Sequence, residues 1–419
     1  MTASIDNNMA AKCAASSCRS CGSIGLRPVL DLGLMPLSDG LVREDQTASE
    51  DARYPLEVAF CPKCSLVQIL QTVPPEVLFR QDYPYYSSVI DTLMEHSRRN
   101  ALELIERHRL GKNSLVVEIA SNDGYLLRNF VQNSIPVLGI DPAQGPVAEA
   151  AKVGVESLCA FFTCNLAAKL RDDNCQADVI IANNVLAHVA DTNGFVEGVR
   201  ILLKDDGEAV IECPYVRDLI DNCEFDTIYH EHLCYFSITA LNHLFNRHGL
   251  FINEIRHLDI HGGSLRLYVG KKDKASPDLQ QMLDHEHAIG LDDYLYYQAF
   301  SERVEEIRTG LRRLLMDLRQ QGCSIAAYGA PAKGTILLNY LGLGRGDIPF
   351  TVDRNIRKHG KYVPGVRIPI LDTSALLDNM PDYTLLLPWN FQSEILKQQQ
   401  PYRSRGGRFI IPIPNPRIV

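Results

Sequence analysis

Four short apolar runs, separated by longer polar stretches, restrict the fold of this chain more than any other feature. They read SLVVEIA, PVLGID, ADVIIAN and GEAVIEC and lie between residues 114 and 213. Because none of them alternates apolar and polar residues, both faces of each strand should be covered, as in a parallel sheet. Two more runs, FINEIRHLDI and SLRLYVG, are joined only by His261-Gly-Gly, which predicts an antiparallel hairpin. The chain is therefore expected to hold an α/β domain built on a mostly parallel sheet.

The edge of this sheet and the runs that follow it predict the architecture. An antiparallel end to a parallel sheet favours a methyltransferase-type Rossmann sheet over a dehydrogenase domain. A second series, SIAAYG, PFTVD, YTLLLP and RFIIPIP, follows a charged, helix-prone stretch at residues 271–320. This series predicts a smaller, Rossmann-like α/β unit at the C-terminus, and a helix is expected over residues 89–107. The expected domains are residues 1–75, 76–270 and 271–419.

Two CxxC pairs near the N-terminus predict a metal site. Cys18 and Cys21 form the first pair, and Cys61 and Cys64 form the second. Each pair projects two thiolates from one tight turn, and four thiolates complete a closed tetrahedral shell around Zn²⁺. A redox role is the alternative for one such pair, but two pairs within seventy residues favour zinc. Since four ligands leave no open position, the zinc should be structural, in a zinc-knuckle domain.

The composition excludes several classes of protein. The 419 residues carry 42 Lys and Arg against 51 Asp and Glu, so the net charge is −9. This balance argues against a nucleic-acid-binding coat but leaves room for a local basic pocket. No apolar run of about 18 residues is present, so no membrane-spanning helix is expected. The N-terminus lacks the pattern of a signal peptide, and the scattered cysteines suit a reducing cytoplasm.

The turn after the first strand of the sheet predicts a cofactor site. Its sequence, from Val117 to Gly124, lacks GxGxxG and has Ala120 where Gly is usual. With so few glycines, the loop offers a diphosphate little access to the backbone N–H groups, which favours S-adenosylmethionine over NAD. Asp141 ends the second strand, where a carboxylate meets ribose hydroxyls in such folds. The candidate cofactor residues are Glu118, Asn122, Asp123, Gly124, Asp141, Phe162 and Asn183.

A dense group of titratable side chains lies in the segment YHEHLCYF. Tyr229, His230, Glu231 and His232 are consecutive, and the HExxH spacing of zinc proteases is absent. Two imidazoles, a carboxylate and a phenol suit proton abstraction beside a carbonyl group. His188, in NNVLAHV, follows another strand at the same edge of the sheet. A polar surface loop is the alternative interpretation of the segment.

At this point the order of motifs resembles a known family, the sugar C-methyltransferases. The motifs are CRSCG…CPKC, YPYYSS, VVEIASNDGYLL, NNVLAHV, YHEHLCYF, HGGSLR, YGAPAKG and LPWNF. The resemblance spans about residues 13–415. It implies a zinc-binding N-terminal domain, a methyltransferase domain, and a Rossmann-like C-terminal domain that completes a sugar-nucleotide site. It also implies an S-adenosylmethionine-dependent enzyme that acts on nucleotide-linked 4-keto deoxysugars.

The resemblance also implies residue roles. His232 is similar in place to the base that removes the proton from C3, next to the ketone. Tyr229 and His188 correspond to groups that stabilise the enolate oxygen. Glu231 and one tyrosine of YPYYSS, either Tyr83 or Tyr86, would line the sugar.

Basic and polar residues of the C-terminal half are candidates for binding the substrate. Tyr328 and Lys333 lie in YGAPAKG, at a predicted strand-to-helix turn whose N–H groups could face a diphosphate. The same turn could instead be purely structural. Arg266, Lys361 and Arg367 are further cationic candidates, unless they belong to a solvated surface.

Together these patterns predict methyl transfer from S-adenosylmethionine to C3 of an NDP-4-keto-deoxysugar, dTDP-linked by resemblance. The enzyme would remove a proton to form an enolate, which then takes the methyl group. Two alternatives are an NAD-dependent epimerase or reductase of nucleotide sugars and a non-catalytic zinc-knuckle scaffold. The missing glycine fingerprint argues against the first, and the intact YHEH segment argues against the second. The sequence leaves the oligomeric state and the sugar's substitution pattern open.

Overall fold

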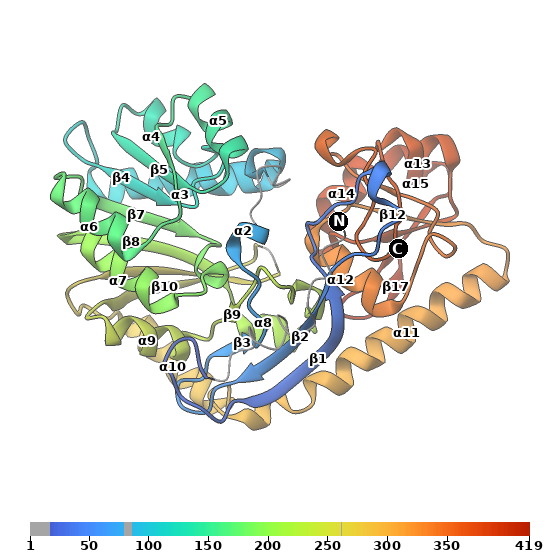
Figure 1. Ribbon diagram of the computed structural model, residues 1–419, viewed down its shortest axis with the longest axis horizontal. Helices are drawn as coiled ribbons and strands as arrows, with labels where there is room; N and C mark the ends of the chain where they lie inside the picture. The colour runs from blue at the N-terminus through green and yellow to red at the C-terminus, as the bar shows by residue number, and fades with distance from the viewer. Residues whose placement is uncertain (1–16, 79–85, 261) are drawn as a thin grey trace, which may run out of the picture.

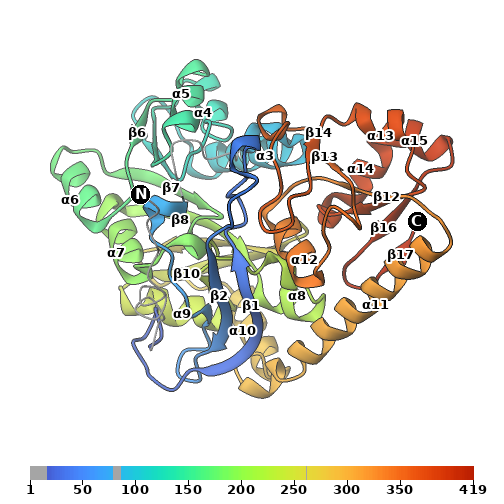
Figure 2. The ribbon, with the colours of Figure 1, turned by 45° about the vertical axis from the view of Figure 1, so that its right-hand side comes forward.

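A computed structural model describes residues 17–78, 86–260 and 262–419 and arranges them around three sheets (Figure 1). Two α/β units stand side by side, and a long N-terminal hairpin runs across the junction between them. Turning the molecule by 45° shows the hairpin in front of both units (Figure 2). His261, which belongs to the predicted hairpin loop, and Tyr83 lie outside the described residues.

The middle sheet has seven strands in the order β10-β11-β8-β7-β4-β5-β6. Strands β6, β5, β4, β7 and β8 are parallel, whereas β11 is antiparallel to both β8 and β10. The predicted methyltransferase-type sheet and its hairpin are therefore confirmed. The strands are β4 (Val116–Ile119), β5 (Val137–Asp141), β6 (Ser157–Cys159), β7 (Ala177–Asn183), β8 (Leu203–Pro214), β10 (Phe251–Leu258) and β11 (Ser264–Gly270).

Both faces of this sheet are buried, which explains the lack of alternation in its strands. Val116 and Val179 face helices on one side, whereas Val117 and Ile180 face helices on the other. The first face is covered by α3 (Asp91–His108), α4 (Arg128–Gln132) and α5 (Gln144–Lys152), and the second by α6 (Cys164–Asp172), α7 (Thr192–Leu202) and α9 (Ile238–Arg247). The helix expected over residues 89–107 is α3.

The C-terminal sheet has six strands in the order β14-β13-β12-β15-β16-β17, and only β17 is antiparallel to its neighbour. The four predicted strands are present, and the two-residue strands β14 and β17 were not expected. Helices α10 (Pro277–Ala288) and α11 (Phe300–Gln320) connect the two α/β units. The strands are β12 (Ile325–Tyr328), β13 (Thr351–Val352), β14 (Ile370–Leu371), β15 (Tyr383–Leu386), β16 (Arg408–Ile411) and β17 (Arg417–Ile418).

The N-terminal sheet contains a strand from the middle of the chain. Its order is β1 (Arg27–Pro36), β2 (Arg53–Phe60), β3 (Val67–Ile69) and β9 (Cys234–Tyr235). Strand β9 follows directly after the YHEH segment, so the zinc-binding part of the chain pairs with the predicted reactive segment. At its other end the hairpin contacts the C-terminal unit, where Asp51 pairs with Arg367. Across the described parts of the chain, every helix is too short or too polar to span a lipid bilayer.

Candidate active site

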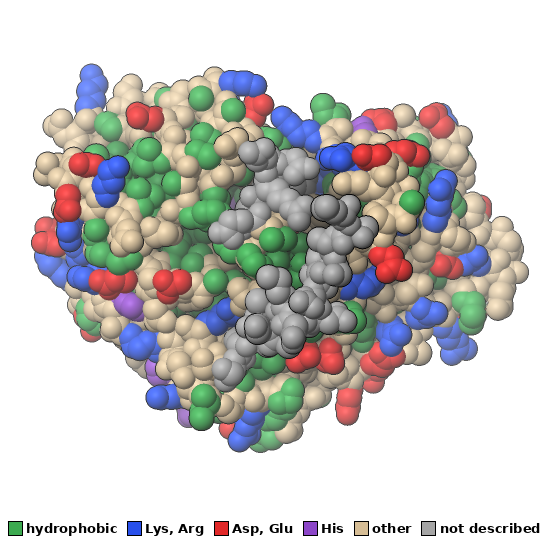
Figure 3. Space-filling model, in the orientation of Figure 1, with side chains coloured by type: hydrophobic (Ala, Val, Ile, Leu, Met, Phe, Trp, Pro, Cys, Tyr) green, Lys and Arg blue, Asp and Glu red, His purple; other side chains and the backbone are tan. Residues whose placement is uncertain are grey.

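A cavity of about 830 Å³ lies at the carboxyl ends of the parallel strands of the middle sheet and reaches the C-terminal unit. Apolar side chains gather between the two units, whereas charged side chains are more frequent on their outer surfaces (Figure 3). The cavity is lined by many predicted site residues: Tyr86, Asn122, Asp141, Phe162, Asn183, His188, Tyr229, Glu231, His232, Tyr328 and Lys333. These residues come from both α/β units, so both units form this one cavity.

Asp141 forms an acidic corner at the end of β5. Its Oδ2 accepts a hydrogen bond from the Asn122 N–H at 3.0 Å, and its Oδ1 accepts one from the Ala143 N–H at 2.8 Å. Each carboxylate oxygen keeps a further lone pair for a ligand hydroxyl. Burial raises the pKa of Asp141, and the two backbone N–H donors oppose that rise. The corner can accept hydrogen bonds from the ribose of a nucleoside.

Ala120 departs from the usual glycine at a position where glycine is favoured. Its φ of 60° lies in the left-handed region, and its N–H donates to the Ile140 carbonyl at 2.7 Å. Only glycine adopts this conformation without a steric penalty at Cβ. The cofactor loop therefore carries backbone strain at Ala120, which the sequence alone did not indicate.

Three predicted cofactor residues lie behind the cavity wall. Glu118 is buried, and desolvation, together with the charge of Asp141, raises its pKa well above the usual value. Asp123 accepts hydrogen bonds from the N–H and the hydroxyl of Ser88, at 3.2 and 2.6 Å. Gly124 has a φ of 74°, and a Cβ there would meet Ala150. These residues build the loop rather than line the cavity, which corrects their predicted placement.

His232 is held in one tautomer. Its Nδ1–H donates to the Thr227 carbonyl at 2.9 Å, and a carbonyl can only accept. The lone pair is therefore on Nε2, which lies 2.9 Å from the Tyr229 hydroxyl. The Tyr229 ring lies 4.1 Å from the imidazole between centroids. The arrangement places a basic nitrogen and a phenol together on the cavity wall.

His188 completes this group from a different strand. It ends η3 (Leu186–His188), directly after β7, and its ring meets that of His232 edge-on at 4.7 Å. Burial lowers the pKa of His188 to about 4, so the imidazole is neutral at pH 7. A neutral imidazole has one N–H donor and one acceptor nitrogen. The sequence prediction that NNVLAHV and YHEH converge agrees with this geometry.

His230 faces away from the cavity. Its Nε2 lies 3.1 Å from the Pro55 carbonyl of β2, and its ring contacts Tyr54 at 5.8 Å. The two imidazoles near the reactive centre are thus His232 and His188, rather than the two of the YHEH segment. The segment forms a turn, in which the His232 N–H donates to the Tyr229 carbonyl at 2.9 Å, and this turn directs Glu231 and His232 to the cavity and His230 toward β2.

The backbone of the reactive segment is fixed by the zinc-binding sheet. The Leu233 N–H donates to the Ala187 carbonyl at 2.7 Å, and the Leu233 carbonyl accepts from the Ile69 N–H at 3.0 Å. Leu233 adjoins His232, and Ala187 adjoins His188. A single residue therefore connects the two imidazole-bearing segments to β3.

Arg266 and Lys361 lie outside the described lining of the cavity, which corrects two predicted substrate contacts. Arg266 lies buried in β11 and pairs with Glu212 at 2.6 Å. Lys361 follows η6 (Ile356–Lys358), and its carbonyl accepts a hydrogen bond from the Ile370 N–H at 2.9 Å. The partner of a charged strand residue such as Arg266 depends on the register of the strands, which the local sequence does not show.

Lys333 lines the cavity, but two carboxyl groups surround it. Its ammonium lies 4.0 Å from the centroid of the Trp389 ring and contacts the Asn390 side-chain oxygen. Burial lowers the pKa of Lys333 to about 8, and the charges of Asp226 and Glu224 oppose that change. Because these neighbours balance its charge, Lys333 is a weaker candidate for a diphosphate contact than the sequence indicated.

Several residues that line the cavity were not expected from the sequence. Asp353 follows a predicted strand as Asp141 does, so the same reasoning could have found it. Phe391 ends the LPWNF motif, which carried the resemblance but no predicted site residue. Asp39 carries no local signal, because it reaches the cavity only through the arrangement of the units. The cavity residues missed at this end are Asp39, Glu224, Asp353, Arg354, Asn355, Lys358 and Phe391.

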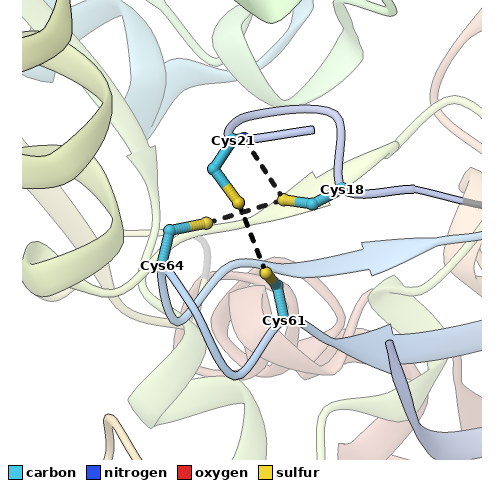
Figure 4. Close-up of side chains that lie close together, drawn as sticks. All are labelled: Cys18, Cys21, Cys61 and Cys64. Atoms are coloured by element: carbon cyan, nitrogen blue, oxygen red, sulfur yellow. Dashed lines mark hydrogen bonds between the residues drawn. The ribbon is translucent and has the colours of Figure 1, made fainter. Parts of the chain in front are cut away.

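The four predicted zinc ligands form one cluster (Figure 4). Their sulfur atoms all lie within 4.8 Å of one another. The sulfurs of Cys18 and Cys64 are 3.5 Å apart, and those of Cys21 and Cys61 are 3.6 Å apart. Zn–S bonds of about 2.3 Å in a tetrahedron place sulfurs about 3.8 Å apart, so the cluster fits zinc. Four thiolates would fill the coordination shell, as a structural site requires.

Comparisons with known proteins agree with this geometry. A model described as a zinc binding domain matches residues 18–79, a methyltransferase domain matches residues 93–254, and a C-methyltransferase C-terminal domain matches residues 259–414. The chain is 35% identical over 405 residues to the C-methyltransferase NovU of Streptomyces niveus, and the match covers 96% of each chain.

Solved structures of methyltransferases match a smaller part of the chain. Magnesium protoporphyrin IX methyltransferase from Synechocystis PCC 6803, with bound SAH, is 14% identical with a TM-score of 0.35. That match covers 43% of this chain and 83% of the other. An S-adenosylmethionine-dependent methyltransferase from Clostridium acetobutylicum is 12% identical with a TM-score of 0.36, over 43% of this chain and 92% of the other.

The matched methyltransferase domain contains the loop and the acidic corner of the cavity, so the protein is an S-adenosylmethionine-dependent methyltransferase. The relative of similar length narrows this class, since its match extends through the zinc-binding and C-terminal parts. The chain belongs to the C-methyltransferase family. The predicted cofactor and zinc-binding domain are confirmed, in preference to the NAD-dependent alternative.

Proposed function

We propose that the enzyme methylates C3 of an NDP-4-keto-deoxysugar, with His232 as the base. The observation that carries the proposal is the fixed tautomer of His232, whose Nε2 lies beside Tyr229 on the cavity wall. A carbon atom must become nucleophilic before it can accept a methyl group, and a C–H next to a ketone is acidic enough to lose its proton to a base. His232 can supply that base near neutral pH.

The neighbours of His232 support an enolate. When bound, S-adenosylmethionine supplies an electrophilic methyl group. The proton from the sugar would reach His232 Nε2 either directly or through the Tyr229 hydroxyl that lies against it. We propose that the Tyr229 hydroxyl donates to the developing enolate oxygen, and that neutral His188, whose N–H donates to the Glu231 backbone carbonyl, holds His232 in place. Hydrogen-bond donors that face this oxygen lower the activation barrier for enolate formation, because the new negative charge develops there. We also propose that Glu231 and Tyr86 line the sugar. Tyr83, which lies outside the described residues, is proposed for the same role.

A second acidic corner supports a nucleotide on the substrate. Asp353 follows β13, and its Oδ2 accepts from the Ala330 N–H at 2.7 Å while its Oδ1 accepts from the Asn355 N–H at 2.8 Å. Asp141 makes the same two kinds of bond at the end of β5. We assign the substrate nucleoside to the Asp353 corner. The proposed cations for its diphosphate are Arg354, which lies 3.4 Å from both Asp91 and Glu394 at the surface, and Lys358, whose ammonium donates to the Ala330 carbonyl at 2.8 Å.

The proposal extends to the organisation and location of the enzyme. We place the domain boundaries near residues 75 and 270, so that the three parts are residues 1–75, 76–270 and 271–419. The described cysteines outside the zinc cluster are free thiols, which supports a reducing, cytoplasmic location. The proposed partners are small molecules rather than nucleic acid or membrane.

A direct assay tests the substrate class. Purified enzyme with S-adenosylmethionine would be offered matched pairs of NDP-sugars that differ only in a 4-keto or a 4-hydroxyl group. We expect a mass gain of one CH2 group for a 4-keto sugar and none for its 4-hydroxyl partner. Deuterium at C3 should be lost on methylation. Transfer to the 4-hydroxyl partner, or retention of the C3 deuterium, would contradict the proposal.

A further inference from the structure

The turn η4 (Phe225–Thr227) lies between the reactive segment and the C-terminal unit. The Trp389 Nε1–H donates to Asp226 Oδ2 at 2.8 Å. The Phe225 ring packs edge-on against Tyr340 of α12 (Ala332–Leu341), with 5.3 Å between centroids. Trp389 begins η7 (Trp389–Phe391). Residues of two C-terminal elements therefore hold a turn that belongs to the middle of the chain.

The same turn carries the carbonyl that orients the imidazole of His232. Thr227 accepts the His232 Nδ1–H at 2.9 Å through its backbone oxygen. The Thr227 N–H and hydroxyl both donate to the Glu224 carbonyl, at 3.0 and 2.7 Å. Because Asp226 and Thr227 are neighbours in this short turn, a shift of the Asp226 side chain would displace the Thr227 carbonyl.

Lys333 supplies the positive charge that this turn needs. Asp226 is fully buried, and burial raises its pKa to about 6, whereas the charge of Lys333 lowers it. Burial likewise raises the pKa of Glu224 to about 8, again opposed by Lys333. Without the ammonium, two carboxyl groups would share a buried site and repel each other when ionised. The ring of Trp389 lies against the same ammonium, so one C-terminal cluster contacts Asp226 through both a hydrogen bond and a charge.

We propose that Trp389 and Lys333 are positioning residues for His232, and that they act through η4. The C-terminal unit then contributes to proton abstraction although neither side chain contacts the imidazole. This positioning role rests on the proposed function in one respect, the assignment of His232 as the base. The positioning of His232 itself can be measured without turnover.

Trp389→Phe is the most specific variant, because it removes the indole N–H and keeps an aromatic ring beside Lys333. We expect kcat to fall about 10-fold, the effect of losing one hydrogen bond to a charged group, with little change in KM for either substrate. Histidine labelled with ¹⁵N reports the tautomer, and the His232 signals are assigned by their loss in His232→Asn. The Nδ1–H signal of His232 should weaken in Trp389→Phe, and the acid limb of the kcat profile should move to lower pH, because the imidazolium loses its carbonyl partner.

Tyr402→Phe is the matched control. Tyr402 is a buried aromatic of the same unit, and its hydroxyl donates to the Pro381 carbonyl at 2.7 Å without contacting η4. This control should lower stability yet leave kcat and the His232 signals unchanged. A second measurement uses the fluorescence of Trp389, the only tryptophan of the chain. Its emission should change as Asp226 ionises, and Lys333→Met should move that change to higher pH.

The outcomes separate this inference from the proposed function. Unchanged kcat, pH profile and His232 signals in Trp389→Phe, together with an inactive His232→Asn, would overturn the positioning role and leave the proposed function intact. An active His232→Asn would instead overturn the proposed function. In that case a changed His232 signal in Trp389→Phe would still establish the structural link through η4.

Discussion

Asp353 in the C-terminal unit makes the same pair of backbone hydrogen bonds as Asp141 in the methyltransferase unit. Each carboxylate accepts one N–H from the loop after the neighbouring strand and one from the residue two positions ahead. Both residues line one cavity. In the proposed function, the Asp141 corner binds the nucleoside of the cofactor and the Asp353 corner binds that of the substrate.

Asp141→Ala should weaken the binding of S-adenosylmethionine. A hydrogen bond to a charged group contributes about 1.5–3 kcal/mol, so the affinity should fall about 10- to 150-fold. Calorimetry with the cofactor measures this directly. Asp353→Ala is the matched control, and it should weaken binding of a nucleoside diphosphate while the cofactor affinity stays unchanged. Loss of cofactor affinity in Asp353→Ala alone would reverse the assignment of the two corners.

Ala120→Gly should stabilise the protein. The alanine is held at a φ of 60°, where Cβ costs about 1–2 kcal/mol and the flexibility of glycine offsets part of the gain. We expect a net increase of about 1 kcal/mol in the free energy of unfolding, measured without cofactor. Ala167→Gly, in the buried part of α6, should do the opposite because its backbone is helical. Equal destabilisation by both changes would show that Ala120 carries no strain.

Replacing Cys61 and Cys64 by Ser should release zinc and lower the activity. The route is structural, since β3 lies in the zinc-binding sheet and its Ile69 holds Leu233 next to His232. The zinc content, measured by metal analysis, should fall from about one zinc per chain to less than half, and kcat should fall with it. Cys175 and Cys323 lie outside the cluster, so the control variant with Cys175→Ser and Cys323→Ser should keep its zinc and its kcat. Full activity in a zinc-free variant would separate the metal from the reactive segment.

Stability should decrease in acid because of buried neutral histidines. Burial lowers the pKa of His188 to about 4 from a usual 6.5. The native state therefore binds fewer protons than the unfolded state between these values, so this contribution is complete above pH 6.5 and is lost as the pH falls to 4. The loss attributed to His188 is about 3 kcal/mol. Urea unfolding of His188→Asn should show a shallower decrease over this range, whereas a change at the exposed His285 should leave the slope unaltered. An unchanged slope in His188→Asn would contradict the burial argument.

Local sequence patterns predicted the elements but not the contacts between them. Apolar runs identified most strands of both α/β sheets, because burial on both faces is visible in each run, whereas the two-residue strands β14 and β17 were not identified. The pairing of β9 with β3 was not predicted, since a two-residue strand has no periodicity. The link from Trp389 to Asp226 joins residues far apart in the chain, and only the packing of the two units brings them together.

Some residues of the candidate site were predicted from local patterns, whereas others were misplaced because their positions depend on contacts between elements. His188 was predicted because its motif follows a strand, and strand ends meet at one edge of a parallel sheet. His232 and Tyr229 were predicted from the dense YHEH segment and from the resemblance to the family. Arg266 was misplaced because its positive charge is visible in the sequence, whereas its buried partner Glu212 depends on the register of β11 against β8. Glu118 was misplaced because a strand residue next to the loop can point either toward the ligand or into the core.

The central claim is that His232 removes the C3 proton before the methyl group moves. The most direct measurement is exchange of the C3 hydrogen in deuterated water, with the sugar nucleotide and a non-reactive cofactor analogue bound. Wild-type enzyme and Tyr402→Phe should exchange it, whereas His232→Asn should bind both ligands, lose exchange and turn over at least about 100-fold more slowly. Exchange and methyl transfer at near wild-type rates in His232→Asn would contradict the account and move the base to Tyr229 or His188.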